Sequence, residues 1–159
     1  MNAMVDSSPI NALRIEQEHY AEALVTELEP LLKRNWEESP SYKADIKLDI
    51  DWPRYKKLDE LGMVMCVTGR INGELIGYCI WFIVQSFNYK GLRTAHGTAF
   101  YVRPEHRGNG VPMLRGGERL LKAQGIKRFY WFCNEGTLLH KLLLGIGYEP
   151  DELVMEKIL

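Results

Sequence analysis

The chain has 159 residues, of which 46% are hydrophobic and 26% are charged, as is ordinary for one soluble globular domain. Its formal net charge is −1 and its lysines and arginines are spread along the chain, which argues against a basic nucleic-acid-binding surface, so we expect no nucleic-acid partner. The longest apolar run, residues 75–84, is far shorter than the roughly 20 residues that cross a bilayer, so it predicts a buried strand and no membrane partner.

The first residues of the chain show no targeting pattern. Residues 1–9 are small and polar, so we expect them to be disordered, with one domain over residues 10–159. They lack the basic start and continuous apolar stretch of a signal peptide. Cys66, Cys79 and Cys133 lie in apolar segments without C-x-x-C spacing, which favours free buried thiols in a reducing compartment. We therefore expect a cytoplasmic protein.

The first third of the chain predicts a strand and two helices. Residues 13–15 alternate apolar and charged side chains, which allows a short strand. Leucines at helical spacing then predict an amphipathic helix over residues 20–36. Pro30 lies inside this pattern, so we expect either a kink or two abutting helices there. Asp51, followed by Trp-Pro, predicts the N-cap of a second helix, which Gly62 ends.

The middle of the chain predicts an antiparallel meander. Two apolar segments, residues 63–70 and 75–84, flank Asn72-Gly73. This dipeptide is the strongest short hairpin signal, because a type I′ turn needs positive φ at both central residues. A third strand over residues 95–102 follows a polar connection.

The last part of the chain predicts alternating helices and strands. A glycine-containing loop leads into a helix over residues 111–124. Residues 126–133 are apolar on both faces, so we expect a strand in the centre of the sheet. A helix over residues 138–144 and a final strand over residues 153–158 complete the order βα(α)βββαβαβ. The predicted fold class is α/β (α+β), with a mixed, mostly antiparallel sheet and helices on both faces.

The segment Arg107-Gly108-Asn109-Gly110 lies between the strand that ends at Val102 and the following helix. A helix N-terminus offers unsatisfied N–H groups and a partial positive charge, which suit a pyrophosphate. Glycines let the backbone approach the phosphate oxygens, and Arg107 can add a charge-assisted contact. The segment therefore predicts a phosphate-binding site.

Two common phosphate-binding motifs fit this segment poorly. A P-loop needs Gly-Lys-Ser/Thr at the helix start, where this chain has Gly110-Val111-Pro112. A dinucleotide-binding fingerprint needs a third glycine where the chain has Met113, and it opens a parallel sheet rather than following a hairpin.

The same segment resembles the coenzyme A signature of the GNAT superfamily of N-acetyltransferases, V-x-P-x-x-R-G-x-G-x-G/A followed by a helix. The matching residues are Val102, Pro104, Arg107, Gly108 and Gly110. The resemblance covers most of the chain, from the first helix through the Asn-Gly hairpin to the closing Gly147-Tyr148 segment, and the layout looks most like small members encoded by phages and prophages. It implies a GNAT-like domain over residues 10–159 that moves an acetyl group from acetyl-CoA to a primary amine of a small molecule or protein by direct transfer.

The resemblance also implies which residues bind acetyl-CoA. The backbone N–H groups of Phe100, Tyr101 and Val102 would hold the acetyl carbonyl and the pantetheine arm. The remaining implied coenzyme-binding residues are Arg107, Gly108, Asn109, Gly110, Val111, Pro112 and Asn134. The chain departs from the family pattern twice: Pro112 supplies no N–H, and Leu143 stands where relatives carry a tyrosine acid.

Direct transfer requires a base for the amine and an acid for the thiolate. His96 lies on the strand where relatives often carry a glutamate base, and it can accept a proton near neutral pH. His140 is the candidate acid in place of the missing tyrosine. The alternative for both is a solvent-exposed histidine without a catalytic role, and this is our interpretation of His106. No histidine pair has metal-ligand spacing, so we expect no metal.

Acidic and aromatic residues fall where relatives line the acceptor site, as would suit an amine. They are Trp36, Glu37, Glu38, Asp49, Asp51 and Tyr55. A solvated helix end is the alternative for Glu37 and Glu38, and a plain N-cap is the alternative for Asp51. Pro112 and the missing tyrosine also motivate a second hypothesis, a catalytically inactive GNAT-fold module that binds coenzyme A or a partner protein, which would be a host protein for a phage-encoded member. A homodimer is compatible with either function.

Overall fold

In the computed structural model, which describes residues 12–39, 47–155 and 157, a tight turn joins β2 (Val64–Ile71) to β3 (Glu74–Gln85). Asn72 and Gly73 have φ values of 51° and 81°, the positive values that a type I′ turn requires. The predicted hairpin is therefore confirmed, and it pairs the two most buried strands of the sheet.

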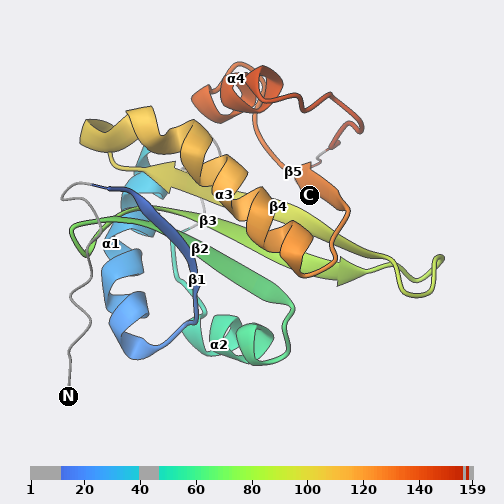
Figure 1. Cartoon of the computed structure of the whole chain (residues 1–159), viewed down its shortest axis with the longest axis horizontal. Coiled ribbons are helices and arrows are strands. Elements are labelled where there is room, and N and C mark those ends of the chain that lie inside the picture. The colour runs from blue at the N-terminus through green and yellow to red at the C-terminus, as the bar shows by residue number, and fades with distance from the viewer. Residues whose placement is uncertain (1–11, 40–46, 156, 158–159) are drawn as a thin grey trace, which may run out of the picture.

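The described sheet has five strands in the order β1-β2-β3-β4-β5 (Figure 1). β1 (Arg14–Glu18) pairs with β2, and β4 (Arg93–Val102) pairs with β3, both antiparallel. β5 (Arg128–Trp131) pairs with β4 in parallel. The predicted mixed, mostly antiparallel sheet is confirmed.

Two predictions about the last strands are wrong. Within the described residues, β5 is only four residues long and lies at the end of the sheet rather than in its centre. Its apolar side chains Phe129 and Trp131 pack against Trp81, and this packing explains the apolar pattern without a second neighbouring strand. Of the final strand predicted over residues 153–158, residues 153–155 form no strand and have exposed side chains, while residues 156 and 158 lie outside the described residues.

One face of the sheet is covered by α1 (Glu22–Glu38) and α2 (Trp52–Glu60). The predicted leucine stripe is buried there, and Asp51 caps α2 by accepting a hydrogen bond from the Arg54 N–H at 3.0 Å. α1 continues through Pro30, so two abutting helices, one of the two expected outcomes, is wrong. Pro30 is exposed, and the buried Leu28 and Leu31 on either side of it anchor one continuous helix.

The other face is covered by α3 (Gly110–Ala123) and α4 (Leu138–Gly145). A short 3₁₀ helix, η1 (Pro104–Asn109), leads from β4 into α3, and Figure 1 shows α3 crossing the sheet. A Cβ atom at Gly116 would lie 2.6 Å from Ile15 Cγ2, so the glycine allows α3 to approach β1 closely.

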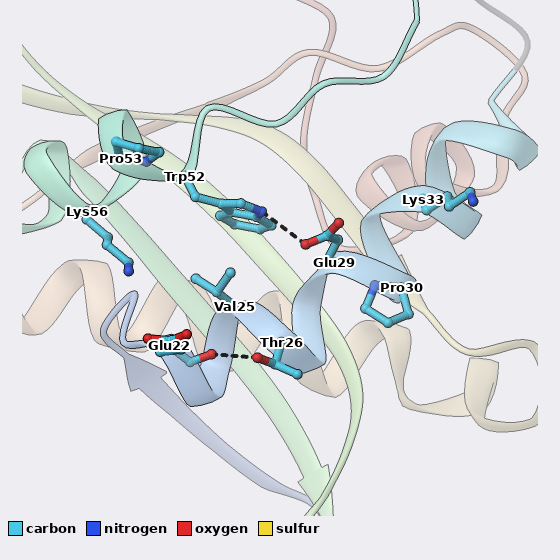
Figure 2. A pocket seen from close by; sticks show the side chains of 9 residues that line it. All are labelled: Glu22, Val25, Thr26, Glu29, Pro30, Lys33, Trp52, Pro53 and Lys56. Atoms are coloured by element: carbon cyan, nitrogen blue, oxygen red, sulfur yellow. Dashed lines mark hydrogen bonds between the residues drawn. The ribbon is translucent and has the colours of Figure 1, made fainter.

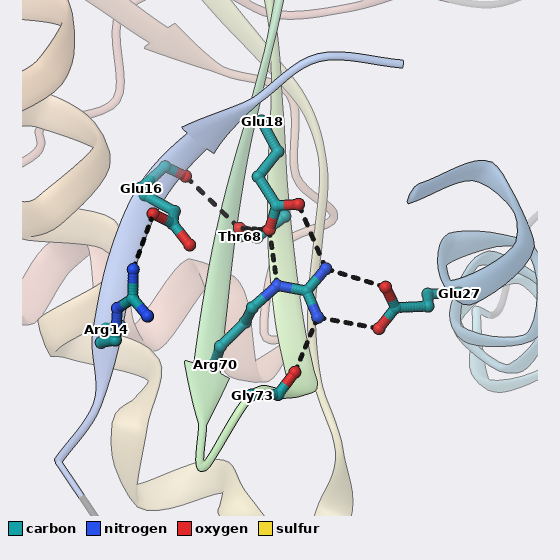
Figure 3. Close-up of polar contacts among 7 residues, drawn as sticks. All are labelled: Arg14, Glu16, Glu18, Glu27, Thr68, Arg70 and Gly73. Atoms are coloured by element: carbon teal, nitrogen blue, oxygen red, sulfur yellow. Dashed lines mark hydrogen bonds and ion pairs between the residues drawn. The ribbon is translucent and has the colours of Figure 1, made fainter. Parts of the chain in front are cut away.

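Arg70 joins three elements far apart in the sequence (Figure 3). Its guanidinium donates to Glu18 of β1 at 2.6 Å, to Glu27 of α1 at 2.8 Å and to the Gly73 carbonyl at 2.9 Å. This network holds α1 against the edge of the sheet.

Within the described residues, no helix is both long and apolar enough to cross a membrane.

Candidate functional site

The candidate site begins where β4 and β5 separate. Their parallel pairing ends at Gly97 and Trp131, followed by a hydrogen bond from the Phe132 N–H to the Gly97 carbonyl at 3.1 Å. At this point β4 carries a bulge, because Ala99 pairs with Ile80 and Gly97 with Trp81, which leaves Thr98 as the extra residue. A bulge bends its strand, and this one lies where β4 leaves β5.

A groove of about 1950 Å³ opens between the separating strands. Its walls come from both faces of the sheet: Asn35 and Trp36 of α1 on one side, and His140 of α4 on the other. Thr98–Val102 of β4 and the C-terminal segment 149–154 also line it.

The backbone of β4 presents alternate residues to this groove. Asn35 Nδ2 donates to the Phe100 carbonyl at 3.4 Å, so the backbone groups of Phe100 point away from β3. The Arg103 N–H instead donates to the Ile76 carbonyl at 2.9 Å, so Arg103 points toward β3. Because backbone groups alternate along a strand, Phe100 and Val102 face the groove while Tyr101 is paired with β3.

This alternation corrects the expectation of three adjacent backbone donors. Only two of the three, Phe100 and Val102, direct their N–H groups toward the groove. Tyr101 contributes its side chain instead, and its hydroxyl donates to Glu38 Oε1 at 3.0 Å.

Aromatic side chains lie beside the point where the strands separate. The Trp131 ring lies 4.3 Å from the Trp81 ring and 6.2 Å from the Phe100 ring, measured between centroids. A Cβ atom at Gly97 would come within 2.4 Å of the Trp131 ring. Gly97 is therefore the residue that allows Trp131 to lie over β4 and line the groove.

The expected phosphate site follows directly from β4. Gly110 donates its N–H to the Arg107 carbonyl, and Pro112 has no N–H, so among the first three residues of α3 one donor is committed and another is missing. A Cβ atom at Gly110 would lie 3.1 Å from Leu142 Cδ1 of α4, so close helix packing also requires this glycine. A Cβ atom at Gly108 would meet no atom within 4 Å, which leaves room for a ligand.

The rest of this segment is held by side chains. Asn109 Nδ2 donates to the His106 carbonyl at 3.0 Å within η1. The Arg107 guanidinium forms an ion pair with Glu38, the last residue of α1. Arg107 therefore lies at the groove wall, but a carboxylate already neutralises its charge.

His96 lines the groove from β4. Its Nε2 lies 3.0 Å from Thr94 Oγ1, and its ring centroid lies 5.1 Å from that of Tyr130. Burial lowers the pKa of His96, and the nearby Glu152 carboxylate opposes this effect only in part. The imidazole is therefore neutral at neutral pH, the state that can accept a proton.

His140 lines the same groove from α4. Its Nδ1 accepts a hydrogen bond from the Gly136 N–H at 3.0 Å, so Nε2 is the ring nitrogen that carries the proton in the neutral form. Leu143, at the position of the family's tyrosine, is buried in the core and offers no alternative acid. Asn134 also lines the groove, and its carbonyl accepts from Thr137 Oγ1 at 2.7 Å.

The residues predicted to line the acceptor site are only partly brought together. Trp36 lines the groove, whereas Glu37 is exposed outside it. Asp51 serves as a helix cap, and Tyr55 packs 5.1 Å from Tyr20, measured between ring centroids, in the core beneath α2. Of the two adjacent glutamates at the end of α1, it is Glu38 that lines the groove.

A second, separate hollow of about 690 Å³ lies between α1 and α2 (Figure 2). Trp52 Nε1 donates to Glu29 Oε2 across it at 3.3 Å. None of the residues predicted for the site lines this hollow. Among the described residues, no group of three or more His, Cys, Asp or Glu side chains could hold a metal ion.

Comparison with known proteins supplies the context for this geometry. Residues 20–140 match the model of the acetyltransferase (GNAT) family. A search of the curated proteins returned no match.

Three solved structures share the fold over nearly their whole length. The ribosomal-protein-alanine N-acetyltransferase of Brucella melitensis biovar Abortus 2308 is 18% identical, with a TM-score of 0.69 over 93% of this chain and 100% of that one. A predicted acetyltransferase from Clostridium acetobutylicum, with acetyl-CoA, is 15% identical, with a TM-score of 0.70 over 92% and 96%. An aminoglycoside acetyltransferase from an uncultured soil metagenomic sample, in complex with sisomicin, is 11% identical, with a TM-score of 0.73 over 92% and 95%.

Proposed function

Because the chain belongs to the GNAT acetyltransferase family, we propose that it transfers the acetyl group of acetyl-CoA to a primary amine of a small molecule or protein. The observation that carries this proposal is the continuity of the site. The strand that separates from β5 runs through η1 directly into the N-terminus of α3, so the groove and the phosphate-binding segment adjoin. The structural relatives include an enzyme for a ribosomal protein and one for aminoglycosides, which supports both classes of acceptor.

In this proposal, the pyrophosphate of acetyl-CoA lies against residues 108–111, where the backbone is open at Gly108 and the helix dipole favours negative charge. The pantetheine arm then follows β4 in the groove. The backbone N–H groups of Phe100 and Val102 face it, and they can hold the amide of the arm and the thioester carbonyl.

The chemistry is direct transfer between two bound substrates. The neutral amine attacks the thioester carbonyl, a C–N bond forms, and the C–S bond breaks to release coenzyme A. We assign His96 as the base that takes the proton from the amine, because burial keeps its imidazole neutral. We assign His140 to the departing thiolate, because its Nε2–H is left to donate a hydrogen bond to the sulfur, and solvent water supplies the proton that converts the thiolate to the thiol.

One observation favours a second candidate function, a module that binds coenzyme A or a protein without catalysis, as in a small phage-encoded effector. Pro112 removes one backbone donor from the start of α3, and Gly110 has already committed its own. The loss of these two donors should lower the affinity for the pyrophosphate. They leave the groove and His96 intact, so we favour the enzyme.

The experiment that separates the two is a transfer assay. The protein is incubated with acetyl-CoA and a panel of spermidine, aminoglycosides and peptides with N-terminal alanine or internal lysine. Release of coenzyme A is followed with a thiol reagent, and products are identified by mass spectrometry. We expect an acetylated amine that requires the protein. Coenzyme binding without any acetylated product across the panel would favour the non-catalytic module.

A further inference from the structure

Arg107 and Glu38 join the coenzyme-binding segment to the first helix. Arg107 belongs to η1, and Glu38 is the last residue of α1, 69 positions earlier in the chain. One carboxylate oxygen of Glu38 pairs with Arg107, and the other accepts from the Tyr101 hydroxyl of β4. All three residues line the groove.

The ion pair is exposed enough to exchange partners. The side chains of Arg107 and Glu38 are 41% and 45% exposed, and an exposed ion pair contributes little net stability. A pyrophosphate carries more negative charge than one carboxylate and can accept two parallel hydrogen bonds from a guanidinium. It would therefore displace Glu38 from Arg107. A pantetheine arm has no charge with which to compete.

We propose that Glu38 competes with the pyrophosphate of coenzyme A for Arg107 and so lowers the affinity of the protein for phosphate-bearing thioesters. Its carboxylate neutralises Arg107 in the free protein, and only a ligand with a phosphate group at the start of α3 releases the arginine. The proposal rests on the proposed function, since it assumes that coenzyme A binds at this segment. It deepens that function by naming the residue that weakens the binding of phosphate-bearing thioesters and leaves the binding of phosphate-free ones unchanged.

The test is a double-mutant cycle measured by calorimetric titration with coenzyme A. Glu38→Gln removes the competing carboxylate and keeps the shape of the side chain, so we expect about two- to fivefold tighter binding of coenzyme A. Arg107→Ala should weaken binding, and in that background Glu38→Gln should bring no gain. Pantetheine, used as the phosphate-free probe, should gain nothing from Glu38→Gln.

The matched control is Glu105→Gln. Glu105 is an exposed carboxylate on η1, two residues from Arg107 and outside the groove, so its removal changes the net charge by the same amount. We expect it to tighten coenzyme A binding much less than Glu38→Gln does.

Three results would overturn the proposal: unchanged or weaker coenzyme A affinity in Glu38→Gln, the same gain in the Arg107→Ala background, or an equal gain in Glu105→Gln. A wild-type protein that binds no coenzyme A would contradict the proposed function itself, and this proposal with it. The two failures are therefore distinguishable.

Discussion

The environment of His96 on β4 favours the neutral imidazole that a catalytic base requires. Thr94 and His96 both lie on β4 and are joined through Thr94 Oγ1 and His96 Nε2, and burial depresses the pKa of the imidazole. If His96 is the base, His96→Ala should lower kcat by about 10²- to 10⁴-fold while the Kd of acetyl-CoA stays unchanged. Initial rates and calorimetric titration measure the two quantities. A loss below tenfold would remove His96 from the mechanism and leave the acyltransferase assignment in place.

The pH profile gives an independent check on His96. A protonated His96 can no longer accept the proton of the amine, so kcat/KM should fall as the pH drops through the pKa of His96 in the free protein. Because that pKa is lowered, the fall should begin below the ordinary histidine value of about 6.5. This fall in kcat/KM on the acidic side of the profile should disappear in His96→Ala. A profile whose acid limb persists in the variant would assign the titration to another group.

At the scale of elements, the N-terminus of α3 is the part of the site that departs from its family. Pro112→Ala restores one backbone N–H at the start of the helix. Hydrogen bonds to charged groups contribute about 1.5–3 kcal/mol, so coenzyme A should bind about 10- to 150-fold more tightly. Pro53→Ala is the matched control, since Pro53 lies in the first turn of α2 outside the groove. Equal affinity in wild type and Pro112→Ala would mean that this donor does not reach the pyrophosphate.

The junction of β4 and β5 depends on Gly97. A methyl group there would collide with the Trp131 ring, so Gly97→Ala should lower the free energy of unfolding by about 1–3 kcal/mol, as overpacked sites do. Gly145→Ala, at the end of α4, places its methyl group where no atom lies within 4 Å and should be close to neutral. Chemical denaturation measures both. Equal stability of wild type and Gly97→Ala would show that Trp131 has room to move.

Local signals in the sequence predicted the elements well. The Asn72-Gly73 turn and the Asp51 cap each depend on a few adjacent residues, and both are confirmed. The position of β5 in the sheet depends on which distant segments pack against it, so its apolar pattern misled the prediction. Pro30 misled only in part: the buried leucines around it keep α1 continuous, which contradicts two abutting helices, and the alternative of a kink stays a prediction.

The site was harder to predict because it is assembled from segments far apart in the chain. The prediction named both Glu37 and Glu38 for the acceptor site. Periodicity could have selected Glu38 between them, because it follows the buried Leu31 by seven residues and so lies on the same face of α1. The motif around Arg107 predicts a coenzyme-binding segment, and this stays a prediction. The ion pair between Arg107 and Glu38 could be found only from the fold.

For the whole molecule, the Arg70 network fixes α1 against the sheet and so supports one wall of the groove. Breaking it with Arg70→Gln should lower the free energy of unfolding by about 2–3 kcal/mol, somewhat less than for a fully buried pair. Arg14→Gln, which breaks a more exposed pair with Glu16, should cost less than about 1 kcal/mol. Thermal unfolding of both variants checks the difference, and equal costs would contradict this role of Arg70.

The same network should make stability depend on acid. Burial alone would raise the pKa of Glu18, but hydrogen bonds from Arg70 and Thr68 outweigh it and lower the pKa. A lowered pKa stabilises the fold above the unfolded-state value of about 4.3, and this contribution is lost as the pH falls through the folded-state pKa. The difference in free energy of unfolding between wild type and Arg70→Gln should therefore become smaller below about pH 4.

The central claim, that acetyl-CoA binds at the start of α3, is tested most directly by thermal unfolding of the wild-type protein with increasing acetyl-CoA. A ligand at 100 times its Kd stabilises the folded state by about 2.7 kcal/mol. For a chain of this size each kcal/mol raises Tm by roughly 2–4 °C, so we expect a saturable rise of about 5–11 °C. An unchanged Tm at millimolar acetyl-CoA would contradict the claim.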